Sequence, residues 1–536
     1  MSKQIQILPV LLVVCIVLTV ILPIHILQAS NAEPANSWDK LADMPTSRCG
    51  LGLAVVSGKI YAIGGSDDNG ELAVNEMYNP VTNKWSTKTA MLTARTGFAT
   101  AVYENKIYVI GGSVGDNFTN KVEVYDTVSD TWQSVEAMPT PRADLSANIV
   151  DGKIYLMGGK TYANVATDQG LTRVTQVYDV KTDTWSTSTA MPIALQGYAS
   201  VVIGTKIYII GGSKQSILGN DSPVNTLQIY DTQTDKWTNG NPLDYPVSYG
   251  SAVATIGFMA PMRVYYIGGY SMGSFSDKTL IYDVEADSWS EGTKMSTFRA
   301  YLGLTVVDDV IYAIGGFDGS KWLSLNEECK PQGYGKVPPT IKVISPENRT
   351  YKSLQIEYEV NRAVAWTGFS LNDKANSTLT GITEITDIPD GQHCIIIFAN
   401  DTLGNMGASQ PVHFTIDNAA PTITILMPLE QTYKTADIVL TFVINKPATY
   451  LSYNLDGQLE TPITGNTTLT ALSNGKHSII VHAIDEAGNT GSSNEIKFTI
   501  STFPIFKVIT AIMLTIIILA ATYIAFKRVK TTNNKH

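Results

Sequence analysis

The heptapeptide KIYAIGG, at residues 59–65, decides the fold because close copies of it return five more times. The copies are KIYVIGG at 106–112, KIYLMGG at 153–159, KIYIIGG at 206–212, RVYYIGG at 263–269 and VIYAIGG at 310–316. Their second glycines follow one another at intervals of 47, 47, 53, 57 and 47 residues. A near-constant period of about fifty residues, with an apolar run in each copy, indicates a repeat architecture.

A second strand-like run follows the first five copies and ends on tryptophan, as in VEVYDTVSDTW at 122–132. Its alternation of apolar and polar residues is typical of a half-buried strand. A methionine or leucine follows each tryptophan by six residues. These pairs are Trp85 and Met91, Trp132 and Met138, Trp185 and Met191, Trp237 and Leu243, and Trp289 and Met295. The pattern predicts four strands per repeat, as in a propeller blade.

The order of Gly-Gly, Tyr, Trp and Met-Pro resembles the kelch repeat, six times over residues 36–333. The resemblance implies an all-β, six-bladed kelch β-propeller. The glycine pairs and aromatic residues then have structural roles, because glycine permits backbone conformations that a side chain would block and aromatic rings fill the space between blades.

The register predicts how the ring of blades closes. No Trp-Met-Pro strand follows the sixth Gly-Gly pair, but Trp38 and Met44-Pro45 stand at the start of the repeat region with the same offset. We therefore predict that the N-terminal strand completes the last blade. We also predict a disulfide between Cys49, after this strand, and Cys329, at the end of its expected neighbour; the alternative is two free thiols.

A different repeat of about eighty residues follows the propeller. PPTIKVISPENRTY at 338–351 matches APTITILMPLEQTY at 420–433, and DTLGN at 401–405 matches DEAGN at 485–489. Short alternating strands with turn clusters predict two β-sandwiches, at 338–417 and 420–501, which resemble prokaryotic surface immunoglobulin-like modules. Asp401 and Asp485 are explained either by calcium binding between modules or by hairpin-turn chemistry. We expect His393 and His477, which begin strands, to serve local packing.

The two ends of the chain predict its location. Residues 1–32 are typical of a secretory signal peptide cut after Ala32, with an uncleaved anchor as the alternative. Val508–Phe526 carries no charge over 19 residues, so we predict a transmembrane helix at 505–526 and a basic cytoplasmic tail at 527–536. The rest of the chain would then be extracellular and anchored by a single pass. Six sequons predict glycosylation at Asn117, Asn220, Asn348, Asn376, Asn400 and Asn466.

Charge and histidine content exclude several functions. The formal net charge of −10 argues against a nucleic-acid partner. No histidine lies between His25 and His393, so the propeller cannot supply a Ser-His-Asp site, a His-based metal site or the copper site of kelch radical oxidases. We assign no catalytic residue, metal ligand or cofactor.

One constellation of residues predicts a binding site. Four residues after the methionine position stand arginines in four repeats, and Leu195 and Val247 in the other two. The arginines are Arg48, Arg95, Arg142 and Arg299. In kelch adaptor proteins that capture acidic peptides, arginines at matching positions line the pocket, which implies a guanidinium-lined mouth for carboxylates, sulfates or phosphates. The alternative is a structural role in which each arginine bonds backbone carbonyls.

Four further ligand-binding candidates lie near the repeats that lack the arginine. The long loops 160–173 and 213–225 flank those repeats and could form the rim of a pocket. The candidates are Tyr162, Arg173, Gln196 and Tyr249.

Three functions remain open. The first is a non-catalytic, membrane-anchored surface binding or adhesion protein whose propeller recognises a protein or an anionic glycan. The second is a carbohydrate-active ecto-enzyme, since kelch propellers resembling sialic-acid epimerases exist. The third is a structural envelope protein.

Overall fold

The computed structural model describes residues 37–162, 170–215, 221–502 and 505–532. The chain divides into two units, Met1–Val337 and Pro338–His536. The predicted signal peptide and the sequon at Asn220 lie outside the described residues, and glycosylation at the other five sequons stays a prediction.

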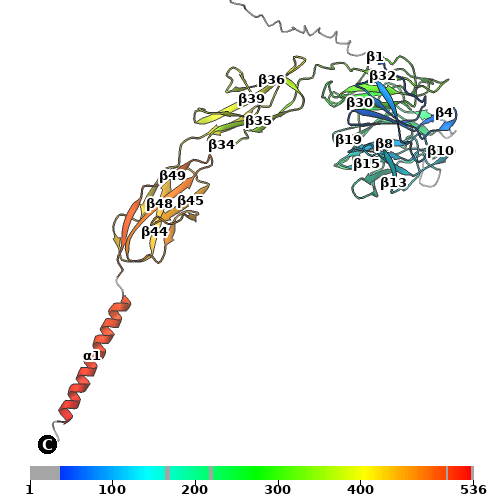
Figure 1. The fold of residues 1–536 in the computed structure, drawn as a ribbon. Coiled ribbons are helices and arrows are strands. Elements are labelled where there is room, and N and C mark those ends of the chain that lie inside the picture. Colours follow the sequence, from blue (N-terminus) through cyan, green and yellow to red (C-terminus); the bar gives the residue numbers. More distant parts are fainter. Residues whose placement is uncertain (1–36, 163–169, 216–220, 503–504, 533–536) are drawn as a thin grey trace, which may run out of the picture. The chain divides into compact units, whose positions relative to one another are not determined.

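The first unit contains six four-stranded antiparallel sheets, the blades of a propeller, and strands β8, β15 and β30 label three of them in Figure 1. Blade 1 is β2 (Gly52–Val56), β3 (Lys59–Ile63), β6 (Asn75–Asn79) and β7 (Lys84–Lys88); blade 2 is β8 (Ala99–Tyr103), β9 (Lys106–Ile110), β12 (Val122–Asp126) and β13 (Thr131–Val135); blade 3 is β14 (Ala147–Val150), β15 (Lys153–Met157), β16 (Thr175–Asp179) and β17 (Thr184–Ser188). Blade 4 is β18 (Ala199–Ile203), β19 (Lys206–Ile210), β22 (Leu227–Asp231) and β23 (Lys236–Asn239); blade 5 is β24 (Ser251–Ala254), β25 (Val264–Ile267), β28 (Thr279–Asp283) and β29 (Ser288–Glu291); blade 6 is β30 (Gly303–Val307), β31 (Val310–Ile314), β32 (Asn326–Cys329) and β1 (Trp38–Lys40).

Short hairpins connect the second and third strands of four blades. They are β4 (Ser66–Asp67) with β5 (Gly70–Glu71), β10 (Ser113–Val114) with β11 (Asn117–Phe118), β20 (Ser213–Gln215) with β21 (Asp221–Pro223), and β26 (Tyr270–Ser271) with β27 (Ser274–Phe275). In blades 3 and 6 a single β-bridge replaces the hairpin. Lys160 pairs with Leu171 in blade 3, and Phe317 pairs with Trp322 in blade 6. Each connection also pairs with the residue that follows the arginine position, so all six lie at the same end of the innermost strands.

The predicted closure of the ring is confirmed. Strand β1 pairs antiparallel with β32, with Trp38 opposite Cys329, and completes blade 6. The Trp38 indole N–H also donates to the Thr293 carbonyl of blade 5 at 3.0 Å. The other five blade tryptophans each donate to a backbone carbonyl of the preceding blade in the same way, as Trp132 does to Thr89 at 2.8 Å. The tryptophan of every repeat therefore joins two blades.

The Gly-Gly pair is required where one blade meets the next. Gly112 has φ +104° and donates its N–H to the Arg142 carbonyl of blade 3 at 2.7 Å. A Cβ on Gly111 would lie 2.6 Å from that same oxygen, closer than a side chain could approach. The same N–H bond recurs at all six boundaries: Gly65 to Arg95, Gly112 to Arg142, Gly159 to Leu195, Gly212 to Val247, Gly269 to Arg299 and Gly316 to Arg48.

The predicted disulfide between Cys49 and Cys329 is wrong, because both cysteines are free thiols. Arg48, next to Cys49, donates its N–H to the Leu323 carbonyl at 3.1 Å. Cys329 lies six residues further along the same segment, or about 20 Å away at roughly 3.3 Å per extended residue. A disulfide requires Cα atoms within about 7 Å. The two cysteines flank the closure in sequence but lie at opposite ends of the blade.

The second unit contains two similar modules, each with a small and a large sheet. In the first, β33 (Ile341–Ser345), β35 (Leu354–Val360) and β38 (Thr383–Ile385) face β34 (Thr350–Tyr351), β41 (Val412–Ile416), β39 (Gly391–Asp401), β36 (Val364–Leu371), β37 (Ser377–Thr378) and β40 (Met406–Ala408). In the second, β42 (Ile423–Met427), β44 (Ile438–Ile444) and β47 (Thr467–Leu469) face β43 (Thr432–Tyr433), β50 (Ile496–Ile500), β48 (Gly475–Ile484), β45 (Tyr450–Leu455), β46 (Thr461–Ile463) and β49 (Thr490–Ser492). One hydrophobic core lies between the sheets of each module; the immunoglobulin-like assignment stays a prediction.

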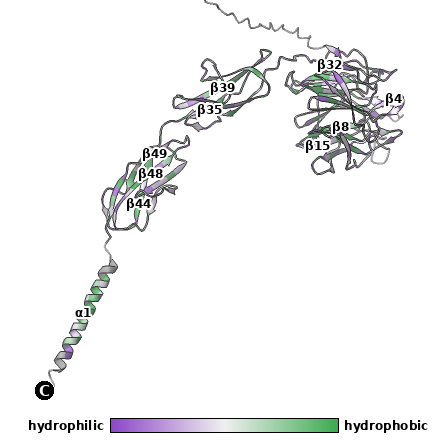
Figure 2. Ribbon diagram, in the orientation of Figure 1, coloured by the Kyte–Doolittle hydropathy of each residue, from purple (hydrophilic) through white to green (hydrophobic). Residues whose placement is uncertain are grey.

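A single helix, α1 (Ile505–Thr532), follows the second module. Its stretch Ile509–Arg528 is long and apolar enough to cross a membrane. Figure 2 shows that α1 is hydrophobic over most of its length and hydrophilic near its C-terminal end. A membrane span at the C-terminus is therefore compatible with the structure, while the side on which each end lies stays a prediction.

We expect the three cysteines of the described residues to be free thiols. If the unfolded, unreduced protein is treated with iodoacetamide, peptide mass mapping should find Cys49, Cys329 and Cys394 each alkylated as fully as in a reduced control, because no two of them pair in the structure. A pair of peptides joined through Cys49 and Cys329 would contradict the structure.

Candidate functional site

The four repeat arginines are fully buried, at 0% exposure. Three of them pair with a glutamate on the third strand of their own blade. The pairs are Arg48 with Glu76 at 2.6 Å, Arg95 with Glu123 at 3.1 Å and Arg299 with Glu327 at 2.6 Å. Arg142 instead donates to the carbonyls of Gly158 and Val174 at 3.0 and 2.8 Å. Burial lowers the pKa of Arg95, Arg142 and Arg299 to about 10, and the glutamates oppose this shift at Arg95 and Arg299.

The prediction that these arginines bind a ligand is therefore wrong, and the structural alternative holds. Guanidinium groups without solvent exposure cannot meet an incoming anion. In the two exceptional repeats both positions differ from the arginine–glutamate pair: Leu195 occurs with Gln228, and Val247 occurs with Leu280. Blade 3 keeps Arg142 although Gln176 replaces the glutamate, and backbone carbonyls hold the guanidinium there instead. A buried charge is tolerated only beside its counter-charge or sufficient hydrogen-bond acceptors.

A closed ring of backbone hydrogen bonds lies at one end of the central channel, two residues beyond the arginine position. Each member donates its N–H to the carbonyl of the member in the preceding blade, at 2.7 to 3.2 Å, and has a left-handed φ between +52° and +60°. The members in order are Gly50, Gly97, Asp144, Gly197, Tyr249 and Tyr301, and Gly50 donates back to Tyr301. Behind the ring is a cavity of about 230 Å³, lined by the innermost strands. We call the end that carries this ring and the six strand connections the mouth.

Three ring members carry side chains although the left-handed conformation favours glycine. For a tyrosine that conformation costs about 1–2 kcal/mol, and such strained residues gather at functional sites. The side chains lean over the preceding ring member: the Asp144 Oδ1 would lie 2.8 Å from a Cβ on Gly97, and the Tyr249 ring 2.3 Å from one on Gly197. Tyr301 follows the same rule, since its ring packs at a tilt against that of Tyr249 with centroids 4.8 Å apart.

Two predicted site residues meet at the mouth through an aspartate that the sequence analysis missed. The Asp221 carboxylate accepts a hydrogen bond from Gln196 Nε2 at 2.7 Å and one from the Tyr249 hydroxyl at 2.6 Å. Gln196 is 2% exposed, and its Oε1 has no hydrogen-bond partner among the described residues. The structure thus places Gln196 and Tyr249 in one polar network on the rim of the channel.

Asp144 is the second acid at the mouth. Its pKa is raised to about 6, chiefly by desolvation and to a smaller extent by the Asp221 charge, while Lys160 opposes the shift. Burial raises the pKa of Tyr249, as do its hydrogen bond to Asp221 and the charge of Asp144, and the pKa of Tyr301 rises for similar reasons. These groups are close enough to influence one another, so they form one electrostatic unit.

The other two candidates do not join this network. The Tyr162 hydroxyl accepts a hydrogen bond from the Phe118 N–H at 2.9 Å and donates to Asn117 at 3.3 Å, which connects the rims of blades 2 and 3. Arg173 is exposed, and its carbonyl accepts the Met191 N–H. Among the described residues, neither contacts Asp221.

The sequence contains one signal that identifies Asp144, Tyr249 and Tyr301 together, a departure from glycine at one repeat position. The repeat places glycine two residues after the arginine position in three copies and replaces it in the other three. Asp221 had no such pattern, because it lies in a hairpin whose length differs between blades.

Aromatic side chains surround the polar network on two sides of the mouth. Phe118 and Tyr162 pack with ring centroids 5.0 Å apart. Across blades 5 and 6 a chain of ring contacts runs through Tyr270, Phe275, Phe317 and Trp322, at 5.3 to 5.9 Å. Such rings supply contact area at low conformational-entropy cost, as protein interfaces require.

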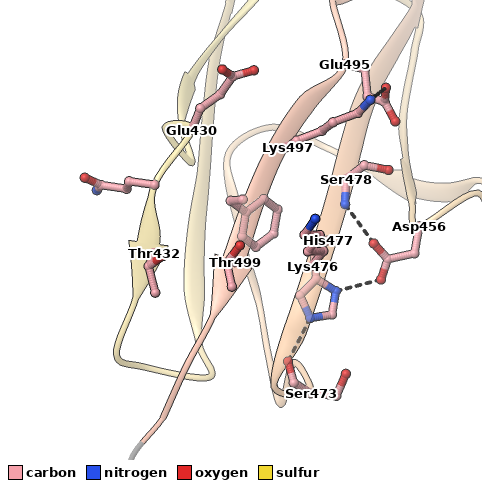
Figure 3. A pocket seen from close by; sticks show the side chains of 12 residues that line it. Glu430, Thr432, Asp456, Ser473, Lys476, His477, Ser478, Glu495, Lys497 and Thr499 are labelled. Carbon is pink, nitrogen blue, oxygen red and sulfur yellow. Dashed lines mark hydrogen bonds and ion pairs between the residues drawn. The ribbon is translucent and has the colours of Figure 1, made fainter.

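A second hollow, of about 850 Å³, lies on the second module around His477 (Figure 3). His477 Nε2 faces the Ser473 carbonyl at 2.8 Å and Nδ1 faces the Asp456 carboxylate at 2.7 Å. Both ring nitrogens thus face acceptors, which favours the charged imidazolium. Burial opposes that charge, but Ser473 and Asp456 outweigh it and raise the pKa of His477. The ring stacks on Phe498, so it also serves local packing, as expected.

The first module differs at one position. His393 Nε2 faces the Pro389 carbonyl at 2.7 Å, but its Nδ1 meets the amide of Asn372 at 2.8 Å. An amide can donate to a neutral ring, so this histidine needs no charge. Both modules place a histidine in this packing position, and this shared motif explains the hollow in Figure 3.

The aspartates at matching positions of the two modules, Asp401 and Asp485, each face a cationic side chain of the same protein. The Lys446 ammonium lies between Asp485 at 2.9 Å and Asp417 at 2.7 Å. Arg362 lies 3.6 Å from Asp401. Asn489 and Asn405 complete the turns by donating their backbone N–H to the same aspartates. These contacts favour the turn interpretation over calcium binding.

Comparisons with known proteins agree with the propeller. A family model described as the Attractin/LZTR1 β-propeller matches residues 60–325. Kelch-like protein 23 of Homo sapiens is 29% identical over 144 residues, 27% of this chain and 24% of that protein. Kelch-like protein 36 of Bos taurus is 33% identical over 121 residues, 22% of this chain and 19% of that protein. The chain thus spans about a quarter or less of the length of these relatives.

Among solved structures, that of YjhT aligns with 53% of this chain and 96% of its own, at 18% identity and a TM-score of 0.45. The family model and the kelch relatives show that the propeller is of the kelch type. The apolar helix α1 adds a candidate membrane span.

The apolar pair Val247 and Leu280 of the fifth repeat suggests a test of the buried ion pairs in the other repeats. Glu76→Leu should destabilise the propeller by roughly 3–5 kcal/mol, because Arg48 remains buried without its counter-charge. Arg48→Val with Glu76→Leu copies the Val247 and Leu280 pair and should recover most of that loss. Unfolding can be followed by tryptophan fluorescence, since all tryptophans except Trp366 lie in the first unit. Equal loss in the single and double variants would contradict the pairing.

The charged state of His477 makes the second module more stable in acid. A raised folded pKa stabilises below the unfolded value near 6.5, and this contribution is lost as pH rises through the folded pKa. Asp456→Asn should therefore cost about 1 kcal/mol at pH 5.5 and less at pH 8.5.

Hydrogen exchange of β48 and β50 in the full chain measures this cost locally. Asn372→Asp in the first module is the reciprocal variant and should introduce the same pH dependence there. An Asp456→Asn effect that is equal at both pH values would show that His477 is not charged.

Proposed function

We propose that this chain is a membrane-anchored surface binding protein whose kelch-type propeller captures a partner at the mouth. The observation that carries the proposal is the pair of strained tyrosines. Tyr249 and Tyr301 hold the left-handed conformation that glycine takes elsewhere in the ring, and Tyr301 is still 40% exposed. Unfavourable backbone geometry combined with an exposed aromatic ring is explained better by recognition than by stability.

The surroundings of the mouth support binding. All six blade connections lie at this end, and their aromatic side chains flank the Asp221 network. Loops that rise from a rigid scaffold are where proteins place variable recognition groups. The buried arginines offer no site for an anion, so we do not carry the anionic glycan forward as the preferred ligand.

The remaining parts have simpler roles in the proposal. The two modules would space the propeller from the membrane, and α1 would anchor the chain, with the propeller and modules outside the cell. The absence of a charge between Val508 and Phe526 and the basic residues that follow support this orientation.

A second function, catalysis on a carbohydrate, is favoured by one specific observation. Asp144, with its pKa raised to about 6, lies near a second carboxylate, Asp221, and raised carboxyl pKa values suit general acids. A bound glycan that is released as a changed product would decide for catalysis. No comparable observation favours a purely structural envelope role, because the mouth holds polar and charged side chains.

The proposal predicts binding that depends on Tyr301. The full chain in lipid nanodiscs would be presented to arrays of glycans and of neutral, acidic and basic peptides. Tyr301→Ala should weaken whatever binds by about tenfold, as expected when a buried aromatic contact of roughly 1.4 kcal/mol or more is lost.

Met262→Ala is the matched control, because it removes an exposed apolar side chain from the connection between β24 and β25, at the opposite end of the innermost strands. This variant should bind as the unchanged protein does. Binding that survives Tyr301→Ala in every class, or no binding by any class, would contradict recognition at the mouth.

A further inference from the structure

The mouth is rich in hydrogen-bond acceptors and poor in donors. No described residue donates a hydrogen bond to the Asp144 carboxylate, whose Oδ1 leans over Gly97. Gln196 uses its Nε2 on Asp221, and its buried Oε1 has no described donor. A ligand that fits this set must bring donors.

The negative charge of the mouth also favours a ligand that carries hydrogen-bond donors. The charge of Asp221 raises the pKa of Asp144. Lys160 lies near Asp144 but forms no ion pair with it within 4 Å among the described contacts. A desolvated carboxylate beside a second negative charge is costly, and a cation placed between Asp144 and Asp221 would offset that cost.

The aromatic pair at the mouth suits a cation as well. Tyr249 and Tyr301 pack against each other with tilted rings, and the hydroxyl of Tyr249 already donates to Asp221. A ring face within about 6 Å of an ammonium or guanidinium stabilises it by roughly 0.5–2 kcal/mol, depending on desolvation. Carboxylates and ring faces therefore converge at one end of the channel.

We propose that the mouth binds the ammonium or guanidinium group of a lysine or arginine side chain from a basic segment of a partner protein. This inference rests on the proposed function and specifies its ligand. The charged group would lie between the Asp144 and Asp221 carboxylates and against the Tyr249–Tyr301 ring pair. An ammonium carries three donors and a guanidinium five, which matches the unfilled acceptors of the mouth.

The rim extends this preference beyond the single side chain. The described strand connections of blades 1, 2 and 6 add acidic residues around the mouth, and the exposed lysines there are fewer. The acidic residues are Asp67, Asp68, Glu71, Asp116 and Asp318. The basic residues on these three connections are Lys121 and Lys321, and the described parts of the other three carry Lys160, Arg173, Lys214 and Lys278. Complementary charge of this kind favours a basic segment and accelerates its association.

The site has a characteristic pH dependence. The titratable groups that face Asp144 are Lys160, Asp221, Tyr249 and Tyr301, and Cys49 faces Tyr301. The tyrosines and the Cys49 thiol have raised pKa values and stay neutral near pH 7. Asp144 is thus the mouth carboxyl whose pKa lies near 6, and binding of a cation should strengthen as pH rises from 5 to 7.

The test uses the full chain in nanodiscs and two soluble probes. One is a twelve-residue peptide of glycine, serine and tyrosine with three lysines, and the other is the same peptide with every lysine acetylated. We expect the lysine peptide to bind at least tenfold more tightly. Asp144→Asn and Asp221→Asn should each weaken it about tenfold, as expected for loss of a charged hydrogen bond. Asp144→Asn should also abolish the rise in affinity between pH 5 and pH 7.

The control is Asp151→Asn. Asp151 lies at the other end of the same innermost strand, β14, is exposed and has φ +51°, close to the +53° of Asp144. Asparagine tolerates this conformation, so both variants should fold, and hydrogen exchange of β14 would verify it. The control should change affinity by less than twofold. An equal loss in Asp151→Asn would show general attraction to an acidic protein and overturn the proposal.

Two other outcomes overturn it in distinguishable ways. If the acetylated peptide or a neutral glycan binds as tightly and still depends on Tyr301, the mouth is a recognition site but not for a cation. If no probe depends on Tyr301, Asp144 or Asp221, both the cation proposal and recognition at the mouth fail.

Discussion

The contact between each Gly-Gly pair and one backbone carbonyl of the next blade is the constraint on which the propeller depends. The first glycine leaves room for that oxygen, and the second donates its N–H to it, as Gly111 and Gly112 do to Arg142. Any side chain at these positions would push the blades apart. Because the contact also joins Gly316 to Arg48, it closes the ring at the same place as the β1–β32 pairing and gives six equivalent boundaries.

The arginines form the other side of this boundary between blades. Their backbone carbonyls accept the glycine bonds, and their side chains turn inward to carboxylates and carbonyls of the same blade. Blades 4 and 5 show that the boundary does not need the charge, since Leu195 and Val247 accept the same backbone bond. Where arginine and glutamate are both present, as in blades 1, 2 and 6, losing only one leaves a buried charge, so the two positions are coupled in those repeats.

Because the arginines are buried, the distinctive side chains of the mouth come from the hydrogen-bonded ring itself. Three members are glycine, as the left-handed backbone favours, and three are Asp144, Tyr249 and Tyr301. Each of these side chains lies over the ring member before it, so the glycines at 97 and 197 are required by their neighbours as well as by φ. The six-fold scaffold thereby becomes one-sided, with its acids and paired tyrosines over blades 3 to 6.

The two modules of the second unit show the same principle on a smaller scale. Their histidines occupy equivalent positions and stack on equivalent phenylalanines, yet Asp456 in one module and Asn372 in the other change the charge state that the site favours. Likewise, Lys446 fills the position between Asp417 and Asp485 where a bound cation would otherwise be sought. Equivalent backbone positions do not imply equivalent chemistry.

Periodicity, glycine placement and a run of apolar residues were enough to predict the six-bladed architecture, the strand that closes it and the apolar C-terminal helix. The sequence also pointed to Gln196 and Tyr249. It did not determine where the arginine side chains turn, that Cys49 and Cys329 lie at opposite ends of a blade, or that Asp221 joins Gln196 to Tyr249. Those facts depend on side-chain direction and on contacts between residues far apart in the chain, which spacing alone does not encode and only the closed ring of blades fixes.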